Sequence, residues 1–360
     1  MHQVSCGSFF LYFFIYPIHF ADDIDLVFGN DKNISLYREL YYKFVNVNVG
    51  VVSSVVSKQE KEALNIFNFT PDNVSIIGAL SENMCISQKI CLAALLGNPI
   101  CDLNILHSRQ MLLQTLFNID LNPIEHFLFY WSQYEPLFFS LLLHEQNFSL
   151  ITDEKIIEMI NVVLLFLKIA DYALSVRHIF DKPNISYFFS GVNDFVYLYQ
   201  NNREFKECVD YFKTKKNVKK IYFRRHAKIK HLRHFFYFRN VFLRVFVDII
   251  TVMVYNNLHK IRNSFCFVSF LTRNEVSDPY VDVVGMSNFY NNAKVDTSFS
   301  LTLKKVGVKT LMDINGVFAY DSTAKNLLVN IYLAQVFGIA FAKKFSISIF
   351  HKIYTSNLRR

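Results

Sequence analysis

Residues 308–355 decide the expected fold, and they read VKTLMDINGVFAYDSTAKNLLVNIYLAQVFGIAFAKKFSISIFHKIYT. Residues 309–314 predict a short apolar strand, and residues 315–323 predict a turn. A helix that is apolar nearly all round should then run from about 322 to 337, and such helices are normally buried. Residues 345–350 alternate polar and apolar side chains, which predicts a second strand. The stretch therefore predicts one strand, helix and strand crossover of the size that a parallel sheet requires.

The turn keeps part of the chemistry of a phosphate-binding loop. In such a loop, glycine N–H groups surround the phosphates, a lysine reaches the β and γ oxygens, and a Ser or Thr hydroxyl holds Mg²⁺. Ser322 and Thr323 stand where the hydroxyls belong, but Asp321 replaces the lysine. For two unit charges ~4 Å apart at a dielectric of about 20, the attraction between a lysine and a phosphate is worth about 4 kcal/mol. With an aspartate in place of the lysine, this becomes a repulsion of similar size. We therefore do not expect tight ATP binding by the candidate contacts, which are Asn315, Gly316, Asp321, Ser322 and Thr323. An ordinary turn followed by a helix N-cap would also explain these residues.

A second informative stretch is residues 97–110, GNPICDLNILHSRQ. Pro99 predicts a turn, Asp102 can cap the helix that follows, and Arg109 should project from that helix. A generic helical hairpin would have the same pattern, so this stretch alone identifies nothing.

Taken together, the two stretches resemble the MutS family of DNA mismatch-recognition proteins. Residues 315–323, 333–338 and 347–355 are similar to the start of its ATPase domain, which has a Gly-Lys-Ser-Thr loop, a helix with LAQ-x-G and a strand ending in IFT. The family's core domain has Pro-Leu-x-Asp followed by Ile-x-x-Arg-Gln, and the matching residues here are Pro99, Ile100, Asp102, Ile105, Arg109 and Gln110. The Gly-Arg pair that the family has upstream is missing at residues 87–89.

The resemblance covers about residues 60–355 and implies a mainly α fold. It implies a connector-like remnant at 1–60, for which short apolar runs suggest a small α/β piece. Core and lever helices would occupy 61–275, with a clamp-like basic insertion at about 180–240. Residues 276–360 would start a partial α/β P-loop ATPase-like domain. The sequence ends at Arg360, before the family's second acidic motif, so we expect a C-terminally truncated chain without ATP hydrolysis. ATP and Mg²⁺ are implied by the family alone.

Residues 211–247 contain twelve Lys and Arg residues and no Asp or Glu. Interleaved aromatic residues would let the segment pack on one side and present cations on the other. The candidate DNA-binding residues are Lys213, Lys215, Lys216, Lys219, Lys220, Arg224, Arg225, Lys228 and Lys230. Half of such runs are merely solvated faces. Unbalanced positive charge repels itself, however, and a polyanion relieves that repulsion.

Composition excludes several classes of protein. The chain has 360 residues, 52% of them hydrophobic, and a net charge of +8, which fits a globular protein with a polyanionic partner. Its six cysteines form no CxxC pair, so neither a zinc site nor a disulfide framework is expected. Residues 9–16 are too short an apolar run to span a bilayer, and residues 241–255 carry Arg244 and Asp248, so we expect no membrane partner.

Tyr222-Phe223-Arg224-Arg225 also resembles a segment of the meiotic MutS homologues. The lack of room for an N-terminal mismatch-reading domain favours the same branch. The resemblance then implies a nuclear protein that binds double-stranded or branched DNA beside a second MutS homologue, with shape rather than base identity deciding specificity. Two alternatives stay open: a helical scaffold or decayed gene product without a DNA role, and an enzyme. No catalytic or metal-binding constellation supports an enzyme.

Overall fold

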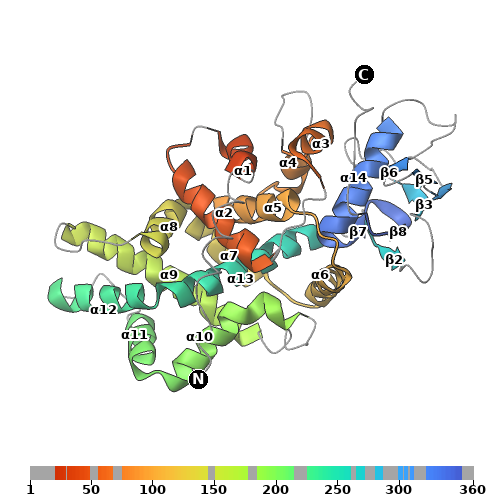
Figure 1. Cartoon of the computed structure of the whole chain (residues 1–360). Coiled ribbons are helices and arrows are strands. Elements are labelled where there is room, and N and C mark those ends of the chain that lie inside the picture. The colour runs from red at the N-terminus through yellow and green to blue at the C-terminus, as the bar shows by residue number, and fades with distance from the viewer. Residues whose placement is uncertain are drawn as a thin grey trace, which may run out of the picture.

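A computed structural model describes residues 21–29, 31–48, 56–67, 75–144, 151–176, 185–214, 225–260, 265–271, 280–286, 299–302, 304–306, 309–311 and 322–350. Most of these residues are helical, which confirms the expected mainly α class (Figure 1). The helices are α1 (Ala21–Phe28), α2 (Ile34–Asn48), α3 (Lys58–Ala63), α4 (Ile76–Leu80), α5 (Ile86–Gly97), α6 (Leu103–Leu116), α7 (Asn122–Trp131), α8 (Glu135–Leu143), α9 (Asp153–Val176), α10 (Ser190–Asn201), α11 (Arg203–Thr214), α12 (Arg225–Tyr237), α13 (Arg239–Lys260) and α14 (Ser322–Phe337). The strands are β1 (Cys266–Phe267), β2 (Ser269–Leu271), β3 (Tyr280–Met286), β4 (Phe299–Thr302), β5 (Lys304–Val306), β6 (Lys309–Leu311), β7 (Ile339–Ala340) and β8 (Ala342–Ser348).

The first described residues are helical where a small α/β piece was expected. In α2, Tyr37, Leu40, Tyr41 and Phe44 are all buried, and they follow the i, i+3, i+4, i+7 spacing of one helix face. This face packs against α5 and α8. The apolar run at residues 9–16, which we interpret as a buried strand of that piece, lies outside the described residues.

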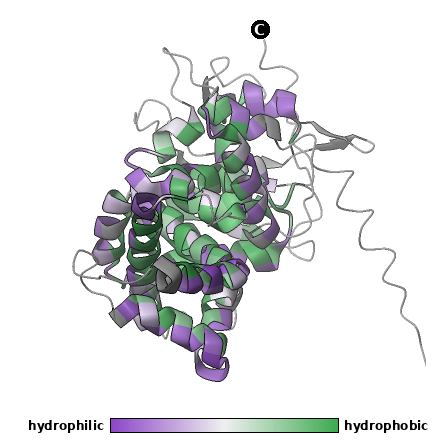
Figure 2. Ribbon diagram, turned by 90° about the vertical axis from the view of Figure 1, so that its left-hand side faces the viewer, coloured by the Kyte–Doolittle hydropathy of each residue, from purple (hydrophilic) through white to green (hydrophobic). Residues whose placement is uncertain are grey.

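Helix α13 forms the centre of the helical part and contacts α5, α6 and α10. The segment of residues 239–258 within it is long and apolar enough to span a membrane, yet 83% of its most apolar stretch is buried inside the protein. Figure 2 shows hydrophobic residues gathered inside the bundle and hydrophilic ones at its periphery. The apolar composition of α13 is therefore explained by its place in the core.

Four strands form the larger sheet, in the order β2-β8-β3-β4. Strand β8 pairs parallel with β2 and antiparallel with β3, in a register that places Val281 opposite Ile347. Strand β6 pairs with β5 instead, so the described strands do not form the predicted crossover from 309–314 to 345–350 as neighbours. Only residues 307 and 308 separate β5 from β6, and so short a connection favours an antiparallel hairpin.

Helix α14 begins and ends where the sequence predicted. Its end is set by Gly338, which has a φ of +74° and whose N–H donates to Ala334 O at 2.9 Å. Strand β8 then begins at Ala342, three residues before the predicted start. Its first residues pair with β3, but their burial does not alternate, so the alternating pattern did not reveal them.

Candidate functional site

Helix α6 meets the end of α14 through two consecutive side chains. Arg109 Nη1 donates to Val336 O, and Gln110 Nε2 donates to Val268 O at 2.8 Å and to Gly338 O at 2.7 Å. The last carbonyls of a helix lack intrahelical partners and carry partial negative charge, so a buried guanidinium and amide stabilise them. Arg109 thus projects from its helix onto the end of α14, where its side chain is completely buried.

The turn before α6 contacts α14 in the same region. Ile100 N donates to Gln335 O at 2.8 Å, and Gln335 Nε2 donates to Phe350 O at 2.7 Å. Phe350 N donates in return to Gln335 Oε1 at 3.2 Å. Asp102 caps α6 as predicted, accepting from Asn104 N at 2.8 Å. The structure thus brings together the two stretches that resemble the MutS family, and we call this contact region the α6–α14 joint.

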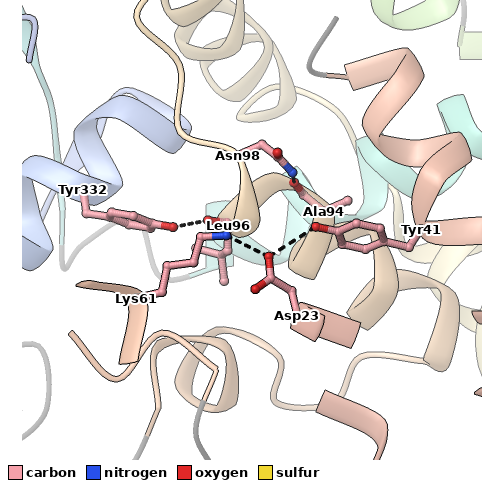
Figure 3. Close-up of polar contacts among 7 residues, drawn as sticks. All are labelled: Asp23, Tyr41, Lys61, Ala94, Leu96, Asn98 and Tyr332. Atoms are coloured by element: carbon pink, nitrogen blue, oxygen red, sulfur yellow. Dashed lines mark hydrogen bonds and ion pairs between the residues drawn. The ribbon is translucent and has the colours of Figure 1, made fainter. Parts of the chain in front are cut away.

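A buried polar cluster lies beside the joint, at the end of α5 (Figure 3). Asp23 Oδ2 accepts from Lys61 Nζ at 2.8 Å and from Tyr41 OH at 3.4 Å. A Cβ at Gly97 would lie 2.7 Å from both Asp23 Oδ2 and Tyr41 OH, so any larger residue there would displace this carboxylate and this hydroxyl. Tyr332 OH of α14 donates to Leu96 O, which fastens α14 to the same place. Burial first, and then Asp23, raises the pKa of Tyr41 well above its usual value, so it stays a neutral donor.

The predicted nucleotide contacts are only partly described. Asn315, Gly316 and Asp321 lie outside the described residues, and Ser322 and Thr323 are described as the first backbone positions of α14. With an aspartate where the lysine belongs, this donor set does not fit a nucleotide triphosphate with Mg²⁺. Among the described residues, no group of three or more His, Cys, Asp or Glu could hold a metal ion.

The basic segment is partly neutralised by acids from other helices. Lys213 Nζ lies 2.5 Å from Asp171 Oδ1 of α9 and 5.2 Å from the centre of the Tyr199 ring. Arg244 Nη1 lies 2.7 Å from Asp194 Oδ2 of α10. Sequence alone missed these acids because they lie outside residues 211–247 and reach the segment only through helix packing. Lys213 is therefore a weaker DNA-binding candidate than its neighbours.

The remaining candidates differ in how far they are described. Lys215, Lys216, Lys219, Lys220 and Arg224 lie outside the described residues, and only the backbone is described for Arg225 and Lys228. Lys230 is exposed on α12, as is Arg233 one turn further on. Arg233 was counted in the basic segment but not among the predicted contacts. Its i+3 spacing from Lys230 on a helix was the signal that would have found it.

A cavity of about 560 Å³ lies between α4, α5, α7 and α13, away from the joint. The described residues of its lining include Glu82 and Glu125 and no Lys or Arg. Two carboxylates without a cation disfavour a phosphate ligand, so this cavity is not the missing nucleotide site. Burial raises the pKa of the Cys91 and Cys208 thiols to about 12, which makes both poor nucleophiles.

No protein-family model matches this chain, and no curated protein is similar enough to count as a match.

Proposed function

We propose that this chain is a MutS-type DNA-binding protein of the nucleus whose nucleotide loop has lost the ability to turn over ATP. The observation that carries the proposal is the exposed pair Lys230 and Arg233 on α12, which follows directly on the basic residues 213–228. The α6–α14 joint adds support, because two stretches that resemble the same family, 227 residues apart between Arg109 and Val336, contact each other.

The DNA-binding test uses a double charge reversal, Lys230→Glu with Arg233→Glu. Affinity for a fluorescent duplex and for a four-way junction is measured by anisotropy over a series of salt concentrations. Each duplex phosphate contact contributes about −0.9 to the slope of log K against log salt, so we expect the slope to flatten by about 1.8. We also expect roughly tenfold weaker binding at moderate salt.

The matched control reverses Lys32 and Lys89, which lie before α2 and on α5 and change the net charge by the same amount. It should leave DNA affinity close to that of the unmodified chain. Equal weakening by both double variants would mean that net charge alone attracts DNA. A slope near zero for the unmodified chain would reject DNA binding altogether.

The nucleotide part of the proposal is tested by phosphate release from Mg-ATP, with and without DNA. We expect no turnover above background, because Asp321 repels the phosphates that a lysine would attract. Asp321→Lys should raise nucleotide affinity measured by a fluorescent ATP analogue, and Ser322→Ala should not lower that of the unmodified chain. Robust turnover by the unmodified chain would overturn this part.

A second candidate is a helical scaffold whose basic face docks an acidic protein. The ion pairs of Lys213 with Asp171 and of Arg244 with Asp194 favour it, since cations of this region already bind protein carboxylates. Polyglutamate of the same length and charge as the DNA separates the two candidates. A scaffold for acidic proteins should bind both polymers equally, whereas the proposed DNA-binding protein should prefer DNA, whose phosphates and shape it contacts.

A further inference from the structure

Exposed residues on α12 and the start of α13 line up along one side. Lys230, Arg233, Tyr237, Asn240 and Arg244 are all exposed and follow each other at intervals of three or four residues. This spacing is the period of one helix face. Helical hydrogen bonds continue through the junction at Phe238, from Phe238 N to His234 O and from Phe242 N to Phe238 O. The five residues therefore form one stripe, which we call the α12–α13 stripe.

Helix α10 adds a second exposed tyrosine beside this stripe. Val192 N donates to Asp248 Oδ2 at 3.0 Å, and the Phe195 and Phe242 rings lie 6.1 Å apart, so α10 and α13 run antiparallel. Tyr197, further along α10, consequently lies toward the α12–α13 junction. It is also one turn after Asp194, which is paired with Arg244 of the stripe. The exposed face of α10 and the stripe thus meet at that ion pair.

Both tyrosines are far more exposed than the aromatic residues around them. Tyr237 is 78% exposed and Tyr197 is 66% exposed, whereas Phe205, Phe235 and Phe242 next to them are completely buried. The Tyr237 ring lies 4.9 Å from the Phe238 ring at 88°, an edge contact that orients it. Two exposed aromatic rings, together with the cations of the stripe, form a surface suited to stacking.

Two acids near the stripe, Glu207 and Asp194, are bound by arginines, and one of these, Arg244, belongs to the stripe itself. Glu207 is bound by Arg203 Nε at 2.8 Å, and that hydrogen bond first, then Lys230 and His234, lowers the pKa of Glu207. Asp194 is held by Arg244. Along the helix, Arg233 and Tyr237 are separated by about 6 Å, at 1.5 Å per residue, which is close to one nucleotide step in an extended strand.

We propose that this surface binds unpaired nucleotides of DNA, with phosphates on Lys230 and Arg233 and bases stacked on Tyr197 and Tyr237. The inference rests on the proposed DNA binding and narrows its ligand to single-stranded segments. In an intact duplex the base faces are covered by their neighbours, so exposed tyrosines would gain nothing there. In a single strand every base offers a face, whatever its identity.

The experiment measures the affinity of the full chain for two probes by anisotropy. One is an oligothymidylate of about 20 nucleotides, longer than the roughly 4–16 that one single-strand module covers, and the other is a blunt duplex of similar length. Tyr197→Ala and Tyr237→Ala should each weaken oligothymidylate binding about tenfold and leave duplex binding unchanged. Tyr→Phe at either position should retain the binding, because the ring and not the hydroxyl stacks. Tyr130→Ala, an exposed aromatic on α7, is the control and should change neither affinity.

The outcomes separate this inference from the proposed function. Suppose that Lys230→Glu with Arg233→Glu lowers the affinity for both probes. If the tyrosine variants then lower neither affinity, or lower both equally, the inference fails and DNA binding stands. If the charge reversal leaves both affinities intact, the proposed function fails at this surface and the inference fails with it. Circular dichroism of each variant confirms that the helices are retained.

Discussion

Asp248 is a buried acid whose place in the fold explains its raised pKa. It lies on α13, is 1% exposed, and accepts from Val192 N at the start of α10. Burial first raises the pKa of this carboxyl well above its usual value, Asp194 adds to the rise, and the backbone N–H groups of Gly191 and Val192 and the charge of Arg244 oppose it. The folded state therefore binds this proton more tightly than the unfolded chain does.

The sign of the resulting pH dependence follows directly. From about pH 4 up to the raised pKa, the folded state holds more protons, so Asp248 lowers the free energy of unfolding as pH rises. We expect Asp248→Asn, which keeps an acceptor for Val192 N, to flatten this dependence and to be at least as stable as the unmodified chain near pH 7. Asp248→Ala leaves that N–H unpaired and should cost about 1–3 kcal/mol.

Urea unfolding of the unmodified chain and of Asp248→Asn at about pH 5 and about pH 8 checks this. The difference between the midpoint shifts of the two chains gives the contribution of Asp248. Glu154→Gln, an exposed acid on α9, is the control and should keep the pH dependence of the unmodified chain. An unchanged dependence in Asp248→Asn would show that Asp248 is ionised in the folded state.

At the scale of elements, the end of α14 shows how one glycine joins a helix to its neighbour. Gly338 has a positive φ, and an added Cβ would lie 2.5 Å from Gln110 Cγ. Gly29 ends α1 with a similar φ of +57°, but nothing lies within 4 Å of an added Cβ there. The two glycines share a backbone conformation and differ in their surroundings.

We therefore expect Gly29→Ala to cost about 1–2 kcal/mol, the price of a left-handed conformation in an alanine. Gly338→Ala should cost clearly more, because the same backbone strain is joined by displacement of the buried Gln110 amide from two carbonyls. Urea unfolding of the two variants measures the difference. Equal losses would mean that the Gln110 contact adjusts without cost.

At the scale of the whole molecule, the α6–α14 joint connects the helical bundle to the sheet region. Gln110 and Gln335 contribute hydrogen bonds to Val268, Gly338 and Phe350, and α14 also packs against α5 and α6. Contacts of this kind make neighbouring parts unfold together.

The single tryptophan makes that coupling measurable. Trp131 is buried beside Phe138 in the bundle, so its fluorescence reports the helices, whereas an amide such as that of Ile347 reports the sheet by hydrogen exchange. We expect both probes to give the same opening free energy in the unmodified chain. In Gln110→Ala with Gln335→Ala, the sheet should open at a lower free energy than the bundle.

Gln114→Ala on the exposed face of α6 is the matched control and should leave the two probes together. Probes that already differ in the unmodified chain would show that the joint does not couple the two parts.

The amino-acid sequence by itself determined the elements whose signal is local. Residues 322–337 and 241–258 are apolar over many turns, and Asp102 has the side chain and position of an N-cap, so both helices and the cap were predictable. The helical period of Tyr37, Leu40, Tyr41 and Phe44 was also present in the sequence, although the short apolar runs of residues 1–60 suggested an α/β piece.

Only the tertiary structure decided which elements pair and which charges remain available. Strand β6 could pair with β8 in the four-stranded sheet or with β5, and the two-residue connection to β5 favours the second pairing. Arg109 projects from α6 onto a carbonyl of α14, and this contact buries it. Asp171 and Asp194 neutralise cations far from them in the sequence. These outcomes depend on contacts between distant segments, whose energies no local pattern of residues contains.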